Sequence, residues 1–405
     1  MKNKRVYFFV WMILLSIVLC FSVAEITINF YNFHCKRHRP FWLPDKYLGY
    51  KHASNNWFIY YKNSKGEGIA ITHKTNSMGF LGDDIPLEKP RDVIRIAILG
   101  DSFTEAFQVS ERNNFCSLLE KKLNERFPIA GKRYEVINAG VSGYSPISEF
   151  QFYRKVVSKF KPDRVIVQLF ANDVYEDHKA AAMGVLDDQG YPILLSRFFT
   201  KKYQKFSALK DKTGINRETM SEKFLNFLIE RSRFIEYMYV KIIGARKNSA
   251  YNERMHKKEE FDDANIFFII DQKKLLFYHQ AVVDKAWGET QKYLLAIKNA
   301  VEKDGASFSM FYIPLQCQLV RNTCFGQRGG PSMGTRFNEL LAVFAKEHDI
   351  PFVDILPVFD EFRYDYIYLV PDGHLNEYSH QLVSEELVSL FQKGDSALFE
   401  TKNEK

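Results

Sequence analysis

Two short polar segments hold the residue types that nucleophilic catalysis needs. Ser102 follows Gly100 and Asp101, and Asp372 lies two residues before His374. A serine hydroxyl is a weak nucleophile at neutral pH and needs a nearby base to take its proton. Histidine suits that role because its ordinary pKa, about 6.5, lets it accept and return a proton near neutrality. Asp372 would hold the imidazole tautomer and stabilise the imidazolium.

Two further segments offer hydrogen-bond donors to an oxygen that becomes negatively charged. Gly143 lies within residues 138–145, and Asn172 directly precedes Asp173. Backbone N–H groups, such as that of Ser102, and the side-chain amide of an asparagine can stabilise such an oxyanion, and losing one donor of this kind typically costs ~10²–10³ in turnover. A glycine at position 143 leaves no Cβ in the path of a substrate. Each segment alone is typical of turns, but their order along the chain predicts one site.

Predicted strands and helices place these segments at one edge of a sheet. Apolar runs over 94–99, 134–138 and 164–170 predict buried strands, each of which ends at a polar segment, and helices are predicted over 113–126 and 147–160. The alternation resumes late in the chain, with helices over 282–302, 336–347 and 377–392 and strands over 308–314 and 352–356. This pattern predicts an α/β fold: a doubly wound, flavodoxin-like three-layer sandwich with a parallel sheet. Ligands of such sheets bind outside the carboxyl ends of the strands.

Together, the polar segments resemble the sequence blocks of the SGNH (GDSL-type) hydrolase superfamily, over residues 93–175 and 283–392. The resemblance implies that Ser102 is the nucleophile, that His374 is its base and that Asp372 orients this base. It also implies that the oxyanion donors are Ser102, Gly143 and Asn172.

The chain departs from the pattern of the superfamily at three places. Ala171 and Ala106 replace glycines that are usual there, which predicts an altered pocket shape and no lost catalytic group. The spacing of residues 372–374 is one residue shorter than the commonest Asp-x-x-His, and it resembles a variant found in envelope-anchored and polysaccharide-modifying members. Asp173 and Asp177 are therefore alternative partners for the histidine.

The N-terminus predicts a membrane segment. Residues 6–24 are uncharged and apolar, and they follow the basic residues Lys2, Lys4 and Arg5. About 20 apolar residues span a bilayer as a helix. The same run also fits a secretory signal cleaved near Ala24, although it is longer than the apolar region of most signals. We favour an uncleaved anchor. Either interpretation places the remaining chain outside the cytoplasm, in the periplasm or the extracellular space if the organism is a bacterium.

The sequence patterns divide the chain into five regions. The predicted divisions are an anchor or signal (1–40), an extension that packs on the core (41–91), an SGNH hydrolase-like domain (92–175 and 282–393), a largely helical insertion (176–281) and a disordered tail (394–405). Within the insertion, aromatic residues at helical spacing over 222–243 favour a helix packed on the core over a substrate lid or a membrane-facing surface.

Composition excludes several classes of protein. The hydrophobic fraction of 46% predicts a globular chain, and five cysteines in 405 residues are no disulfide framework. Cys317 and Cys324 either close a small loop or remain free thiols. The net charge of +7 comes from scattered basic residues without a nucleic-acid-binding motif. Metal, phosphate-loop and dinucleotide motifs are absent, so we expect no metal and no cofactor.

The sequence favours a serine-dependent ester hydrolase that acts on an acyl or acetyl ester, with a cell-envelope glycan or a lipid as candidate substrates. Two alternatives remain open at this stage. An O-acetyltransferase of a cell-envelope polysaccharide would use the same residues and discharge the acyl group to a sugar. A non-catalytic SGNH-like binding module would keep the fold alone.

Overall fold

The computed structural model describes residues 2–34, 41–45, 47–61, 70–182, 186–187, 189–192, 280–319, 333–369 and 372–391. The predicted helix over 222–243, the predicted tail after residue 393, and the proposed pairing of Cys317 with Cys324 lie outside the described residues.

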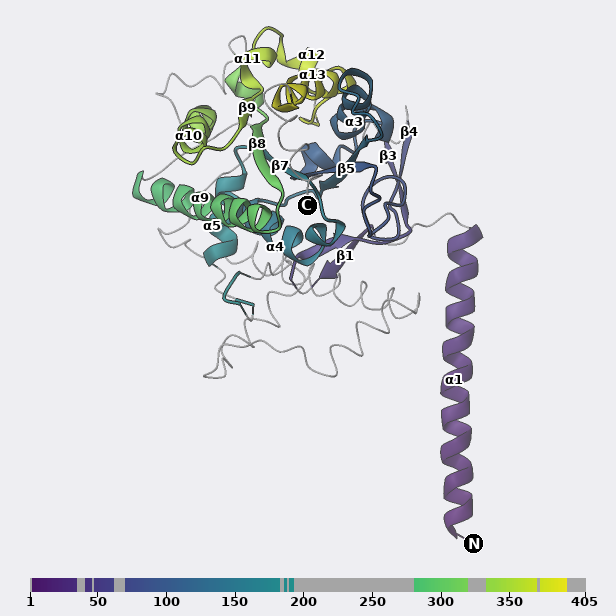
Figure 1. Cartoon of the computed structure of the whole chain (residues 1–405). Helices are drawn as coiled ribbons and strands as arrows, with labels where there is room; N and C mark the ends of the chain where they lie inside the picture. Colours follow the sequence, from purple (N-terminus) through teal and green to yellow (C-terminus); the bar gives the residue numbers. More distant parts are fainter. Residues whose placement is uncertain are drawn as a thin grey trace.

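A five-stranded parallel sheet forms the centre of the molecule (Figure 1). Its strands are β5 (Val93–Gly100), β6 (Arg133–Gly140), β7 (Arg164–Leu169), β8 (Ser307–Tyr312) and β9 (Phe352–Asp354). Their spatial order is β6-β5-β7-β8-β9. The chain therefore places β6 on one side of β5 and then places β7, β8 and β9 in turn on the other side. This order confirms the predicted doubly wound fold. It places the reversal point, where ligands of such folds bind, between β5 and β7.

Helices cover both faces of the sheet, because β5 presents apolar side chains to both. Ala97 and Leu99 contribute to one core cluster and Ile96 and Ile98 to the other. The first cluster includes residues of α4 (Pro146–Lys155), α5 (Asp173–Ala182), α9 (Gln280–Lys303) and α10 (Met333–Glu347). The second includes residues of α3 (Phe115–Arg126), α11 (Leu356–Phe359), α12 (Tyr364–Ile367) and α13 (Glu377–Val388). The helices therefore form the two outer layers of the sandwich.

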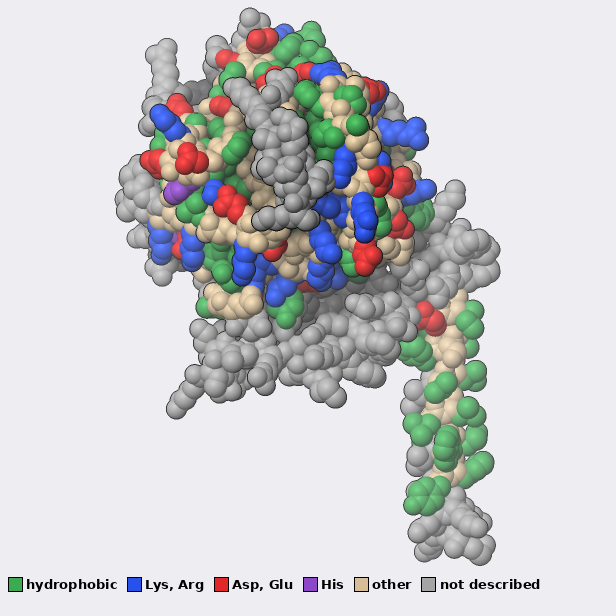
Figure 2. Space-filling model, viewed as in Figure 1, with side chains coloured by type: hydrophobic (Ala, Val, Ile, Leu, Met, Phe, Trp, Pro, Cys, Tyr) green, Lys and Arg blue, Asp and Glu red, His purple; other side chains and the backbone are tan. Residues whose placement is uncertain are grey.

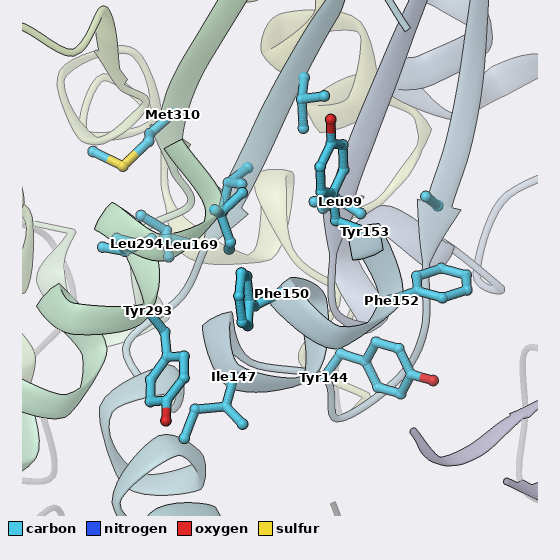
Figure 3. Packing of buried hydrophobic residues seen from close by; sticks show 14 of the residues in the cluster. Leu99, Tyr144, Ile147, Phe150, Phe152, Tyr153, Leu169, Tyr293, Leu294 and Met310 are labelled. Atoms are coloured by element: carbon cyan, nitrogen blue, oxygen red, sulfur yellow. The ribbon is translucent and has the colours of Figure 1, made fainter. Parts of the chain in front are cut away.

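Aromatic side chains fill the first cluster. Figure 3 shows Phe150 of α4 among Leu169 of β7 and Tyr293 and Leu294 of α9. The rings of Phe150 and Tyr293 lie 6.1 Å apart. Much of the aromatic content of the chain therefore serves packing, which holds the strand ends in fixed positions.

Two antiparallel hairpins precede the sheet. One pairs β1 (Trp42–Asp45) with β2 (Gly49–His52), and the other pairs β3 (Trp57–Tyr61) with β4 (Ala70–Lys74). A separate apolar cluster of Phe41, Leu81 and Phe107 joins them to the loop that follows the first strand end. We call residues 41–91 the N-terminal extension.

Helix α1 (Lys2–His34) stands apart from the domain in Figure 1. Its stretch Tyr7–Thr27 has a mean hydropathy of 2.4, and none of it is buried. Figure 2 shows hydrophobic side chains around it. In length and composition this helix fits a membrane anchor or a signal sequence.

Candidate active site

Ser102 begins the short helix α2 (Ser102–Glu105) at the end of β5. The side chain of Asp101 caps this helix by accepting a hydrogen bond from the Phe103 N–H at 2.9 Å. The helix ends after one turn at Ala106, which has a positive φ of 58°. The strand, the cap and this left-handed residue together turn the chain sharply, so that Ser102 lies at the carboxyl edge of the sheet.

The turn is held against the neighbouring strands at very short range. A Cβ on Gly140 would lie 2.3 Å from the backbone nitrogen of Glu105, so only glycine lets α2 approach β6 this closely. Gln168 of β7 accepts hydrogen bonds from the Asp101 N–H at 3.1 Å and the Thr104 hydroxyl at 2.9 Å. The turn that carries Ser102 is therefore fixed from both sides of β5.

His374 lies in the loop before α13 and reaches Ser102. Its Nε2 is 2.8 Å from the Ser102 Oγ, and its Nδ1 is 2.5 Å from the Asp372 Oδ1. The imidazole also packs against the ring of Phe103, with centroids 5.1 Å apart. The loop is closed by a hydrogen bond from the Leu369 N–H to the His374 carbonyl, at 2.8 Å. Ser102, His374 and Asp372 thus form a continuous chain of hydrogen-bond contacts.

Asp372 and His374 shift each other's pKa values in opposite directions. Burial on its own would raise the pKa of Asp372, but hydrogen bonds from His374 and Tyr60 outweigh it and lower that pKa to about 2. Burial would likewise lower the pKa of His374, and the hydrogen bond and charge of Asp372 outweigh it and raise that pKa above its ordinary value. Asp372 is therefore ionised at neutral pH, and His374 is a stronger base than a free imidazole.

The predicted oxyanion donors follow the two strands that flank β5. Gly143 lies in the loop after β6, and Asn172 follows β7. Gly143 has a positive φ of 76°, and a Cβ there would lie 2.8 Å from the Tyr50 hydroxyl. That hydroxyl donates to the Ser142 carbonyl at 2.5 Å. A glycine at 143 therefore satisfies both the local backbone geometry and the close contact with the extension.

The structure reveals partners of the site that the sequence did not indicate. Tyr60 of β3 donates a hydrogen bond from its hydroxyl to Oδ2 of Asp372, at 2.6 Å. His52 of β2 lies 2.5 Å from a Glu105 oxygen, and the Ser142 hydroxyl donates to the other oxygen of Glu105. Both Tyr60 and His52 belong to the extension and lie far from the site in sequence, and no local pattern marks them.

The alternative acids, Asp173 and Asp177, are used elsewhere. Asp173 accepts from the Phe170 N–H at 2.8 Å, and Asp177 from the Ile147 N–H at 2.9 Å. Burial raises the pKa of Asp173 well above its usual range and that of Asp177 to about 7. Among the described residues, only Asp372 has a carboxylate hydrogen-bonded to the imidazole of His374.

Two further buried carboxyls lie in the same part of the molecule. Burial raises the pKa of Asp101 to about 6 and that of Glu149 well above its ordinary value, and these acids interact with Asp173. Within the ranges that the structure describes, no group of three or more His, Cys, Asp and Glu side chains forms a site that could hold a metal ion.

No family model matches the chain, and no curated protein matches its sequence. Similar solved structures include TesA, at 13% identity over 74% of this chain and 98% of that chain, with a TM-score of 0.39. The acetyl xylan esterase AlAXEase is 15% identical over 73% and 99%, with a TM-score of 0.38. A protein of the G-D-S-L family from Desulfitobacterium hafniense DCB-2 is 12% identical over 73% and 98%, with a TM-score of 0.36. The structural neighbours thus include esterases and a member of the G-D-S-L family.

Proposed function

We propose that this chain is a membrane-anchored serine ester hydrolase of the SGNH type that acts outside the cytoplasm on an acyl or acetyl ester. The observation that carries the proposal is the contact chain from Ser102 through His374 to Asp372. A serine, a base and an orienting acid in this arrangement define nucleophilic acyl transfer by their geometry, regardless of sequence position.

The proposed reaction uses the hydrogen-bond contacts between these three side chains. His374 Nε2 takes the proton of the Ser102 hydroxyl as the oxygen attacks the ester carbonyl, and Asp372 stabilises the imidazolium that forms. The backbone N–H groups of Ser102 and Gly143 and the amide of Asn172 are the proposed donors to the oxyanion. His374 then returns the proton to the leaving alcohol, and water releases the acid from Ser102 by the reverse sequence.

Hydrolysis requires that water can reach the acid–base pair. The side chains of His374 and Asp372 are 27% and 28% exposed, so solvent can reach the base. An O-acetyltransferase would use the same residues and pass the acyl group to a sugar hydroxyl. In an assay with an acetyl donor and an oligosaccharide, hydrolysis predicts free acetate as the main product, whereas a transferase would give mainly acetylated sugar.

A fluorophosphonate probe tests the proposal directly, because it reacts with activated serines. We expect the full chain in detergent to be labelled at Ser102, as mapped by mass spectrometry of the peptides. Ser102→Ala and His374→Ala variants should lose both the labelling and the hydrolysis of 4-nitrophenyl acetate. Exposed Ser77 offers a matched control, since Ser77→Ala should change neither. An unlabelled but folded wild-type chain would instead favour the non-catalytic binding module.

The anchor is proposed from α1 and needs its own test. If α1 spans the membrane with the domain outside, added protease should digest the domain in intact cells or spheroplasts but leave cytoplasmic markers whole. Recovery of the domain in a soluble fraction, with a new N-terminus near Ala24, would instead identify a cleaved signal.

A further inference from the structure

We propose that Tyr60 of the N-terminal extension is a positioning residue of the active site and acts through Asp372. This inference rests on the proposed function and deepens it. The carboxylate of Asp372 has two oxygens, and each has a separate partner: Oδ1 accepts from His374 and Oδ2 accepts from Tyr60. The series of hydrogen bonds that begins at Ser102 therefore ends at a tyrosine that lies 312 residues before Asp372 in the sequence.

Tyr60 remains a hydrogen-bond donor at neutral pH. Burial and the hydrogen bond to Asp372 raise the pKa of its phenol above the ordinary value of 10.0. The phenol therefore stays protonated at neutral pH, while Asp372 is ionised. A neutral donor facing a carboxylate makes a strong, directional hydrogen bond, which restricts rotation of the Asp372 side chain and keeps Oδ1 aimed at the imidazole.

The hairpin that carries Tyr60 is itself fixed to the catalytic domain. His73 of β4 contacts the Phe107 carbonyl through Nε2 at 2.9 Å, and Phe58 of β3 packs on the Phe107 ring with centroids 5.0 Å apart. The Tyr60 ring packs against the same apolar cluster. Because Phe107 lies shortly after the turn that carries Ser102, this anchoring couples the position of Tyr60 to that of Ser102.

The rest of the extension holds the opposite side of the site. Tyr50 binds the Ser142 carbonyl, and His52 binds Glu105, whose other oxygen accepts from the Ser142 hydroxyl. Ser142 directly precedes the proposed oxyanion residue Gly143. The extension thus contacts the acid end and the oxyanion end of the proposed site, and Tyr60 is its contact at the acid end.

Tyr60→Phe tests the proposal, because it removes only the hydroxyl. Hydrogen bonds to charged groups predict a loss of about 10-fold in kcat/KM for a small ester, with KM nearly unchanged because the proposed role of Tyr60 acts through Asp372. Added to Asp372→Ala, the same substitution should cost less than about twofold, since its effect passes through the missing carboxylate. An equal loss in both backgrounds, or no loss in either, would overturn the proposal.

The pH dependence of kcat/KM distinguishes the proposed role of Tyr60 from a merely structural one, which would leave it unchanged. Without the phenol, Oδ1 of Asp372 is no longer held toward the imidazole, so the hydrogen bond that raises the pKa of His374 weakens and the acid limb of kcat/KM moves to lower pH. The other charged groups acting on His374, Asp101 and Glu105, are unchanged in the variant. An unmoved acid limb would contradict the proposal.

Tyr153→Phe is the matched control. Tyr153 donates a comparable hydrogen bond to Asp304 at 2.8 Å, but this pair joins α4 to the end of α9 and does not contact the triad. The control should lower thermal stability and leave kcat/KM and the pH profile of folded protein unchanged. Fluorophosphonate labelling separates the two hypotheses: an unlabelled wild type overturns the proposed function, whereas a labelled wild type with an unaffected Tyr60→Phe variant overturns only the role of Tyr60.

Discussion

Removing the carboxylate of Asp372 is the most informative perturbation of the proposed triad. In Asp372→Ala, the imidazole of His374 loses its hydrogen-bond acceptor and the charge that stabilises its protonated form. A hydrogen bond to a charged group contributes about 1.5–3 kcal/mol. Because the Asp372 side chain is 28% exposed, solvent screens part of this interaction, and we expect about 2 kcal/mol, or roughly a 30-fold loss of kcat/KM at pH 8.

The same substitution should change the shape of the pH profile. Hydrolysis requires neutral His374, so activity falls as the pH drops through the pKa of that residue. In the wild type this pKa lies above 6.5, because the interaction with Asp372 outweighs the effect of burial. In the variant only the burial and the weaker charges of Asp101 and Glu105 remain, so the pKa falls and the acid limb moves to lower pH. The 30-fold deficit should therefore shrink at acid pH.

Steady-state hydrolysis of 4-nitrophenyl acetate between pH 5 and 9, corrected for the rate without enzyme, measures both effects. Asp173→Asn is the control, because burial keeps the pKa of Asp173 high and an amide resembles its protonated form. The control should retain the wild-type pH profile. A deficit of Asp372→Ala that is independent of pH, or a shifted limb in Asp173→Asn alone, would refute our assignment of the acid.

Three further substitutions test individual parts of the site. Asn172→Ala should lower kcat by ~10²–10³ with little change in KM, and a loss below about threefold would exclude its role as a donor. Gly140→Ala should lower the free energy of unfolding by about 3 kcal/mol, measured by urea denaturation, because its methyl would lie 2.3 Å from the Glu105 nitrogen. Ala106→Gly should raise that free energy by about 0.5 kcal/mol: relief of the left-handed backbone gains ~1–2 kcal/mol, and the lost buried methyl costs ~0.8 kcal/mol. Destabilisation by Ala106→Gly would contradict this balance.

The sheet could be predicted from the sequence because its strands are buried on both faces. The predicted strand over 94–99 is observed as β5, Val93–Gly100, and the predicted helix over 282–302 as α9, Gln280–Lys303. Each strand of a parallel sheet is buried on both faces, so it appears in the sequence as a continuous apolar run that can be recognised as a strand. The ends of these runs also placed Ser102 and Asn172 at one edge of the sheet.

The supporting contacts of the site could not be predicted in the same way. Glu105 and Gln168 are polar residues within apolar surroundings, and their roles depend on partners from other elements. The hairpin strands of the extension have only four or five residues each, too few for a periodic pattern to be distinguished from a loop. Tyr60 has no sequence signal at all, because its role depends only on where its hairpin packs.

The short spacing between Asp372 and His374 gives the contact with Tyr60 a physical reason. With one residue between them, acid and base share one loop, and the Asp372 Oδ1 accepts from both the backbone N–H and the Nδ1 of His374. Such a loop is too short to enclose the carboxylate, and the Asp372 side chain remains 28% exposed. Without a further donor, its Oδ2 would be bound only by water, and nothing would hold the Asp372 side chain in a single rotamer. Tyr60 supplies from the extension the donor that the loop cannot provide, so the extension and the short spacing are best understood as one structural solution.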